Sequence, residues 1–451
     1  YYSGMTTAGD VFIPMNNSLC NGTIPTLEPT GAPTMLPTVE PTGAPTMQPT
    51  FLPGTDIQSN WNHMEEARSS NGKLLVNLTV DQYFYVNDKV DVGGYWTRVY
   101  NPKSASGNVL TPGVVIWVYP GDKLNVTLMN NLGPENEDHS FNYSDLNNKY
   151  HNFNTTNLHL HGPHIHANHP GDNVINVSVY PGESKYYQYE FPSDHMGGTM
   201  IYHAHHHGST ANNVGGGQVG VLIVLDLPGD IPEEISMLHE IIIAMHDVPI
   251  NQLLGDGNNG IVSVTGDRLQ ENAGNSIGSI SEFILANGAF KPSTNISKGQ
   301  WYRVRMAFVS VTSQIVLQMT NNTANCSWYL LAKDGIYVKD APRNLTRAYM
   351  SSGNRADVVL QCMTEGFVAF GAVEGYNVNA QPTAYQETIF TFTVEDTGAS
   401  MAGALPRFNA KHPNYLANIV NNENAVDIAV DVSGNAAGCT VNGLLWDGKT
   451  P

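Results

Sequence analysis

Histidines are concentrated in one short stretch of this 451-residue chain, at a spacing typical of metal sites. Ten of the sixteen histidines fall between His159 and His207, and they include two H-x-H pairs, His159 with His161 and His203 with His205. A strand turns residues i and i+2 to the same face, so each pair would present two imidazoles side by side. Neutral imidazole binds copper, zinc, iron and nickel, and copper stands highest in affinity. Two such pairs predict a four-histidine metal site rather than unligated surface or core histidines.

The other side chains near these pairs are predicted to have supporting or packing roles. On strand alternation, His207 would continue the face of His203 and His205, while His206 would point away. We expect loop positions at the mouth of the cleft, rather than ligand or ligand-supporting roles, for His164, His166, His206 and His207. Core packing, rather than copper binding or surface exposure, is expected for Met200, Trp117, Trp301, Trp328 and Trp446.

The charge balance excludes one large class of partner. Twenty-one basic and forty acidic residues give a net charge of −19. A surface this acidic repels phosphate backbones, so nucleic-acid binding is not expected. No apolar run approaches the ~20 residues that a bilayer-spanning helix requires, so no membrane span is expected either.

Several features predict a secreted glycoprotein. The chain begins at Tyr1 rather than Met, as expected of a mature protein whose signal peptide has been removed. N-glycosylation sequons are frequent, which is typical of extracellular proteins. The eleven candidate sites are Asn16, Asn21, Asn77, Asn125, Asn142, Asn154, Asn176, Asn295, Asn321, Asn325 and Asn344.

Four cysteines allow three disulfide connectivities, and the sequence does not choose among them. We expect Cys326 to pair with Cys362, since both fall within one predicted domain. Cys20 and Cys439 lie at opposite ends of the chain and would pair within or between chains. Free buried thiols are the alternative, less expected in an oxidising compartment.

The N-terminal part contains a strict tetrapeptide repeat. Residues 1–24 form a short arm, and residues 25–54 carry a Pro-Thr pair every fourth residue. Such a segment cannot build a packed core and favours polyproline II, reaching roughly 85 Å at about 3.1 Å per residue. An arm of this reach predicts self-assembly through residues 1–54, for example by adding a strand to a neighbour's sheet edge. O-glycans are expected at Thr26, Thr30, Thr34, Thr38, Thr42, Thr46 and Thr50.

The rest of the chain predicts an all-β protein made of antiparallel sandwiches, because short alternating strands are separated by Gly- and Pro-rich turns and helices are scarce. A first domain at 55–228 has predicted strands at 74–85, 113–119, 123–130, 185–191 and 219–225. A second domain at 237–395 has predicted strands at 240–246, 283–285, 300–308, 327–332, 356–361 and 387–394. A linker and the first strands of an incomplete third domain, at 427–431 and 438–445, occupy residues 396–451.

These motifs resemble the multicopper oxidase family, in particular its laccase-like and bacterial-type members with three cupredoxin domains. His159-Leu160-His161-Gly162 is similar to the family's first copper motif, and Tyr202-His203-Ala204-His205 to its second. Further similarities lie at residues 111–132, 194–210, 287–288, 303–305, 334–335 and 441–443. The resemblance covers roughly residues 72–451 and implies tandem cupredoxin-like Greek-key sandwiches, with the third domain largely missing.

The resemblance also implies a copper assignment. His159 would ligate the type 2 copper, His161 and His203 one copper of the type 3 pair, and His205 the other. The remaining ligands in the family come from H-x-x-H-x-H and H-C-H-x-x-x-H motifs of the third domain. The second motif does not occur here, and the first occurs only at His161–His166, inside the first histidine motif. Only half of the trinuclear ligands are therefore present, with no type 1 copper site for electron entry.

Two functions follow from these observations. The first is a secreted, glycosylated oxidase whose full form couples oxidation of phenolic or metal-ion donors to reduction of dioxygen to water. It would be an enzyme only if an unseen third domain supplied the type 1 copper and the other ligands. Alternatively, the protein is an extracellular structural or filament-forming glycoprotein linked by its N-terminal arm, with catalysis lost or secondary. A copper-binding protein without turnover is a third, simpler option.

Overall fold

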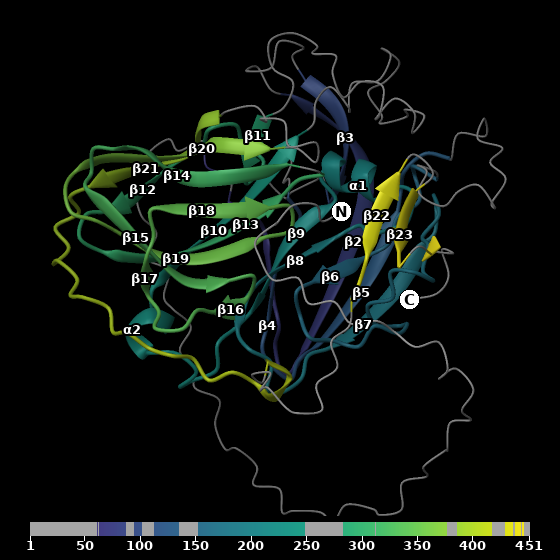
Figure 1. Ribbon diagram of the computed structural model, residues 1–451, viewed down its shortest axis with the longest axis horizontal. Coiled ribbons are helices and arrows are strands. Elements are labelled where there is room, and N and C mark those ends of the chain that lie inside the picture. Colours follow the sequence, from purple (N-terminus) through teal and green to yellow (C-terminus); the bar gives the residue numbers. More distant parts are fainter. Residues whose placement is uncertain are drawn as a thin grey trace, which may run out of the picture.

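The computed structural model describes most of the chain from Trp61 onward. The described residues are 61, 63–86, 94–101, 112–134, 152–248, 283–311, 313–376, 386–416, 429–435, 438–442 and 444–445. The predicted arm, the Pro-Thr repeat with its O-glycosylation sites, and Asn16, Asn21, Cys20, Asn142 and Trp446 lie outside them. Two β-sandwiches lie side by side, the first at the right and the second at the left of Figure 1.

The first sandwich is built from two sheets whose strands alternate between buried and exposed side chains. Strand β5 (Lys123–Asn130) shows the alternation best, since Leu124, Val126 and Leu128 are buried and their neighbours are less so. One sheet has the order β3 (Gly94–Tyr100), β2 (Lys73–Val86), β5 and β7 (Ser184–Glu190). The other has the order β1 (Glu66–Arg68), β4 (Val115–Val118), β9 (Val219–Val224), β8 (Gly198–His203) and β6 (His159–His161).

The second sandwich has the same two-sheet plan. One sheet has the order β11 (Phe283–Ala286), β10 (His239–Val248), β13 (Trp301–Val309), β19 (Arg355–Cys362), β15 (Cys326–Lys333) and β16 (Ile336–Tyr337), with β17 (Arg343–Asn344) also paired to β15. The facing sheet has the order β12 (Ser293–Ser297), β21 (Gln386–Glu395), β20 (Gly366–Tyr376), β14 (Gln314–Asn322) and β18 (Arg347–Ser351). Trp328 and Phe370 pack edge to face in its core.

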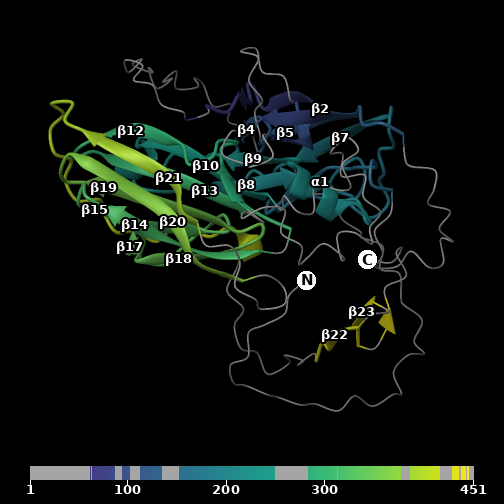
Figure 2. The same cartoon turned by 90° about the horizontal axis from the view of Figure 1, so that it is seen from above.

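The remaining elements are short. They are helices α1 (Thr210–Gly216) and α2 (Glu233–Ser236), the 3-10 turn Asn414–Leu416, and a separate sheet of β22 (Val432–Asn435), β23 (Gly438–Val441) and β24 (Leu444–Leu445), which Figure 2 shows from above. Neither α1 nor α2 is long and apolar enough to cross a bilayer, and the described residues contain no other α-helix.

Most predicted strands are present within a few residues of their expected ends, but one was misplaced. The segment predicted at 427–431 is described from residue 429, and strand β22 begins at Val432 instead. Residues 429–431 lie outside any strand, and Val430 is 61% exposed.

One tryptophan packs in a different domain from the one predicted for it. Trp61 belongs by sequence position to the first domain, yet its indole is buried in the core of the second sandwich. Its ring lies 6.4 Å from that of Phe390 and 6.1 Å from that of Phe392. The described part of the chain therefore begins with a residue packed in the second sandwich, and the strands of the first sandwich follow from Glu66.

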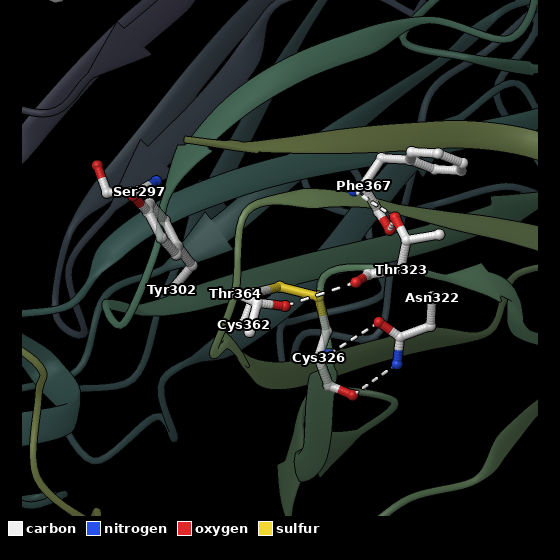
Figure 3. Close-up of a disulfide and its surroundings, with 8 residues drawn as sticks. All are labelled: Ser297, Tyr302, Asn322, Thr323, Cys326, Cys362, Thr364 and Phe367. Atoms are coloured by element: carbon white, nitrogen blue, oxygen red, sulfur yellow. Dashed lines mark hydrogen bonds between the residues drawn. A yellow bond between two sulfur atoms is a disulfide. The ribbon is translucent and has the colours of Figure 1, made fainter. Parts of the chain in front are cut away.

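The predicted disulfide between Cys326 and Cys362 is confirmed. It joins directly paired positions of β15 and β19 in the second sandwich, and Figure 3 shows the bond with its surroundings. Asn322 reinforces this corner, because its side chain accepts from the backbone N–H of Cys326 at 2.8 Å and donates to the Cys326 carbonyl at 2.9 Å.

A buried ion cluster joins the two sandwiches. Arg303 and Arg305, both 1% exposed, extend from β13. Arg303 bonds Asp226 of the first sandwich at 2.8 Å, and Arg305 bonds Asp357 of β19 at 2.8 Å. Asp357 in turn accepts from the hydroxyl of Thr199 in β8 at 2.5 Å. Because β8 carries His203, this cluster sets the position of the histidine strands relative to the second sandwich.

Candidate metal centre

The first histidine pair is positioned by strand β6. Leu160 is 2% exposed and packs into the first sandwich core, so its neighbours His159 and His161 must face the other way. Strand β8 pairs antiparallel with β6 and places His203 directly opposite His159. Core burial of Leu160 and of its partner Tyr202 thus fixes the face on which the imidazoles meet.

The imidazoles of three predicted ligands converge. One ring nitrogen from each of His159, His161 and His203 lies within 4.8 Å of the other two. The closest approach is 3.3 Å, between Nδ1 of His161 and Nε2 of His203. His205 completes the group, with its ring centroid 5.1 Å from that of His159 and 5.7 Å from that of His203.

Hydrogen bonds leave the inward nitrogens of two rings free to act as ligands. His159 Nδ1 lies 2.8 Å from a carboxylate oxygen of Asp172, which can only accept, so Nδ1 carries the proton. His203 Nδ1 lies 2.8 Å from the carbonyl of Ala204 and is protonated for the same reason. In the neutral ring, Nε2 then keeps its lone pair, as metal-binding histidines require.

Burial keeps two of these histidines neutral. It is the main cause that lowers the pKa of His161 to about 3, and the nearby Arg355 guanidinium lowers it further. Burial also lowers the pKa of His203 well below its usual value, assisted by His159. Both rings are therefore uncharged at neutral pH, each with one N–H and one nitrogen that keeps its lone pair.

The donor set fits a small transition-metal ion. Metal–imidazole bonds of about 2.0–2.1 Å at a tetrahedral angle would separate two ligand nitrogens by about 3.3–3.4 Å. The 3.3 Å between His161 Nδ1 and His203 Nε2 agrees with that separation. An all-imidazole set suits copper or zinc better than the oxygen-seeking ions magnesium and calcium.

The strand predicted through the second pair is shorter than expected. Strand β8 ends at His203, so His205 and the residues after it follow no strand alternation. The backbone N–H of His205 is instead held by the Asn157 side-chain oxygen at 2.7 Å. His207, predicted to share the face of His203, therefore has no strand to place it there, and it is half-buried.

His206 contradicts the expectation of a histidine at the cleft mouth. It is 8% exposed, and its two ring nitrogens lie 3.1 Å from the hydroxyls of Ser209 and Ser178. A ring with both nitrogens bonded inside the protein ties the loop after β8 to its surroundings. Sequence alternation could not reveal this, because it assumes a strand that has already ended.

The other side-chain predictions mostly agree with the structure. His164 and His166 are exposed, and His164 stacks on Tyr415 with ring centroids 4.2 Å apart. Met200, Trp117 and Trp328 are buried in cores as predicted, whereas Trp301 is only half-buried.

Three residues that support the site were not singled out by sequence reasoning. They are Asp172, which binds His159; Asn157, which fixes the backbone at His205; and Arg355 of β19, which lies beside the His161–Gly162 segment. Asp172 follows His159 by thirteen residues across a loop, and Arg355 comes from the other sandwich. No local spacing connects Asp172 or Arg355 with the histidines, so the sequence contained no signal for these two residues.

Comparison with known proteins agrees with this geometry. Residues 143–228, which include both H-x-H pairs, match the sequence model of the multicopper oxidase family. No curated protein sequence matches the chain.

Similar folds occur among solved multicopper oxidases. The multicopper oxidase of Pediococcus acidilactici has a TM-score of 0.56 and 18% identity, covering 88% of this chain and 71% of that one. The McoA variant of Aquifex aeolicus has a TM-score of 0.56 and 17% identity, covering 85% and 74%. The metallo-oxidase of Campylobacter jejuni has a TM-score of 0.54 and 17% identity, covering 78% of this chain but only 64% of its own length.

At these identities the solved structures establish the fold, while the matched segment adds the sequence signature of the first domain. The histidine-bearing segment thus matches the multicopper oxidase family in sequence, and the tandem sandwiches have the fold of solved multicopper oxidases.

Proposed function

We propose that this chain carries half of the ligands of a trinuclear copper site in a secreted, glycosylated multicopper oxidase. In its full form, the protein would couple oxidation of phenolic or metal-ion donors to reduction of dioxygen to water. The observation that carries the proposal is the 3.3 Å approach of His161 Nδ1 to His203 Nε2 within a cluster of four imidazoles. In the metal-free chain this contact is an imidazole–imidazole hydrogen bond, in which Nδ1–H of His161 donates to Nε2 of His203, and a bound copper would take the place of that proton between the two nitrogens.

The four histidines have separate roles in this proposal. His161 and His203 would share one copper of the type 3 pair, His205 would bind the other, and His159 would bind the type 2 copper. Copper, once bound, would supply the electron transfer to dioxygen, while the chain fixes ligand geometry. Asp172 and the Ala204 carbonyl do this by holding the His159 and His203 tautomers.

The rest of the copper machinery would have to come from other sequence. The H-C-H-x-x-x-H motif does not occur among the 451 residues, and H-x-x-H-x-H occurs only at His161–His166, beside the first histidine pair. His412 is the only histidine after His246. A further domain, or a second chain seated against β6 and β8, would supply the missing imidazoles and the thiolate of a blue copper site.

Exposure of the sequons supports the glycoprotein part of the proposal. Asn77, Asn176, Asn295, Asn321, Asn325 and Asn344 are exposed, whereas Asn125 and Asn154 are half-buried. Asn154 is the least suitable, because its amide nitrogen donates to the carbonyls of Gly133 and Pro134. A glycan would replace one of these two amide hydrogens.

The structural-glycoprotein alternative depends on residues 1–54, which lie outside the described part of the chain. The two functions are compatible, since an oxidase could also assemble through an N-terminal arm. We therefore keep self-assembly as a secondary proposal.

Metal analysis of the intact protein, purified from its natural source, distinguishes the proposals. An oxidase should contain about four coppers per molecule and show the blue absorption of a copper–thiolate site. It should also consume dioxygen when a phenol is supplied. A protein with neither copper nor a blue band would be a structural glycoprotein instead, and copper without oxygen consumption would leave only metal binding.

A further inference from the structure

A turn of the second sandwich lies against one of the candidate copper ligands. Gly353, buried between β18 and β19, has a φ of +79° and approaches the ring of His161 closely. A Cβ atom at this position would lie 2.6 Å from Cε1 of His161 and 3.3 Å from its Nδ1. Only glycine therefore combines this left-handed backbone with contact against the imidazole.

The turn is rigid enough to position a ring. The side-chain oxygen of Asn354 accepts from the Ser351 backbone N–H at 2.8 Å and closes the turn on itself. The N–H of Gly353 donates to the Phe308 carbonyl at 2.9 Å, and the N–H of Phe308 donates to the Asn354 carbonyl at 2.9 Å. Since Phe308 is fully buried in the second sandwich core, the turn cannot move independently of that core.

Arg355 connects this turn to the strand that carries the partner ligand. Arg355 is only 3% exposed. Its guanidinium donates to the Gly353 carbonyl at 2.7 Å and to the Asp334 carbonyl at 2.9 Å. Its Nε donates to the Thr199 carbonyl of β8 at 3.2 Å. The guanidinium also packs against Gly162, because a Cβ atom added at Gly162 would lie 2.4 Å from one of its nitrogens. One arginine thus spans the His161 segment, the turn and the His203 strand.

We infer that the Ser351–Arg355 turn of the second sandwich is a positioning element that orients the His161 imidazole toward His203. This inference rests on the proposed copper role of the two histidines for its effect on metal binding. The contact itself exists in the metal-free chain and can be tested there. The second sandwich would then contribute to the metal centre without providing a ligand.

The test compares Gly353→Ala with a matched control, Gly182→Ala. Gly182 has nearly the same φ, +81°, but an added Cβ there would meet nothing within 4 Å. The control therefore carries the backbone strain without the contact. Both substitutions are made in the full chain and again in a His161→Ala background, and Cu(I) affinity is measured by competition with a chromophoric chelator. The metal-free proteins, labelled with ¹³C at histidine Cε1, are compared by NMR.

The inference predicts two results. Gly353→Ala shifts the Cε1 signal of His161, assigned by its loss in His161→Ala, and leaves that of His206 in place. It weakens Cu(I) binding about 10-fold or more in the natural background but not when His161 is absent, as expected when a group that orients a ligand is lost. Gly182→Ala does neither.

Two outcomes would overturn the inference: an unmoved His161 signal, or an equal loss of affinity with and without His161. If the unsubstituted chain binds no Cu(I), the proposed function fails, while the NMR comparison still decides whether the turn holds the ring. Should Gly353→Ala not fold, Arg355→Lys gives the same comparison, because lysine cannot bond three carbonyls from one planar group. It must shift the His161 signal for the inference to survive.

Discussion

The tautomer of each histidine decides whether its ring can bind metal. His159 is held by an acceptor-only carboxylate, and the second oxygen of Asp172 accepts from the Leu160 backbone N–H at 2.9 Å. One carboxylate therefore fixes both the ring and the strand on which it sits. This two-point contact makes Asp172 the residue outside the ligand set whose loss should matter most to His159.

Asp172→Asn should weaken copper binding although the variant folds. Asparagine can still accept from Leu160, but it then presents an N–H₂ group to His159 Nδ1 and favours the tautomer protonated at Nε2. We expect Cu(I) affinity to fall about 10- to 100-fold, the usual cost of losing such a contact. Chelator competition measures the affinity, and ¹⁵N NMR of the ring identifies the tautomer. An unchanged affinity alongside a changed tautomer would remove His159 from the ligand set.

His246 provides a test of buried charge away from the metal centre. Its Nε2 lies 3.0 Å from the Val214 carbonyl of α1, and burial lowers its pKa to about 4. Between pH 6.5 and 4 the His246 imidazole is protonated in the unfolded chain but stays neutral in the folded chain. The contribution of His246 to stability is therefore complete above pH 6.5 and declines as the pH falls.

His246→Gln keeps a donor for the Val214 carbonyl but does not titrate. The free energy of unfolding of the unsubstituted chain should fall relative to that of the variant by up to about 1.4 kcal/mol per pH unit between pH 6.5 and 4. Urea unfolding at half-unit steps of pH measures this difference. Parallel curves for the two proteins would show that His246 titrates normally in the folded state.

At this scale the sequence predicted which imidazoles converge but not the residues that support them. The H-x-H spacing identified His159, His161 and His203 because strand geometry alone brings such residues together. His206 was misjudged, since its buried hydrogen bonds depend on where β8 ends. Asp172 and Arg355 depend on loop course and on packing between sandwiches, which residue spacing does not encode.

At the scale of elements, the buried ion cluster joins strands of one sandwich to the other through charged side chains. Asp357 is 1% exposed and accepts from Arg305 at 2.8 Å and from Arg303 at 3.2 Å. Burial alone would raise the pKa of Asp226, but the two guanidinium groups outweigh it and hold that pKa below its usual value. The buried carboxylates and guanidinium groups thus neutralise one another, and each stays charged because the others are close.

Removing one charge from this cluster should be costly. Asp357→Asn removes the carboxylate that both guanidinium groups share, while Asp226 still pairs with Arg303 and Glu240 with Arg305. We expect a loss of about 1.5–3 kcal/mol in the free energy of unfolding, the usual cost of losing hydrogen bonds to a charged group. Chemical denaturation measures it. Lys123→Gln, which removes an exposed pair with Glu190, should leave the unfolding midpoint unchanged. A similar small effect for both variants would mean that water reaches the cluster.

Strand prediction succeeded where the apolar alternation is regular and failed where polar residues or glycines interrupt it. Strand β5 was predicted with its observed bounds, since Leu124, Val126 and Leu128 form one buried face. Strands β14 and β20 were missed because polar residues and glycines interrupt their apolar pattern, although both carry core side chains such as Leu317 and Phe370. Their pairing with each other and with β21 compensates for weak local signals.

For the whole molecule, the sandwich architecture and the family were predictable, and the arrangement of the sandwiches was not. Trp61 shows the difference, since its chain position suggests the first domain and its ring packs in the second. The histidine cluster lies where both sandwiches contribute, with the imidazoles on one and the Gly353 turn on the other. The chain covers only 64% of the Campylobacter jejuni oxidase, so the activity of a complete protein stays a proposal.

The central claim is that the imidazoles of this chain bind copper together. Cu(I) titration of the 451-residue chain, in competition with a chromophoric chelator, tests it most directly. We predict at least one tightly bound equivalent that is lost in His161→Ala and in His203→Ala, but retained in His166→Ala, which removes an exposed histidine outside the cluster. Equal binding by all four proteins, or no binding by the unsubstituted chain, would contradict the account.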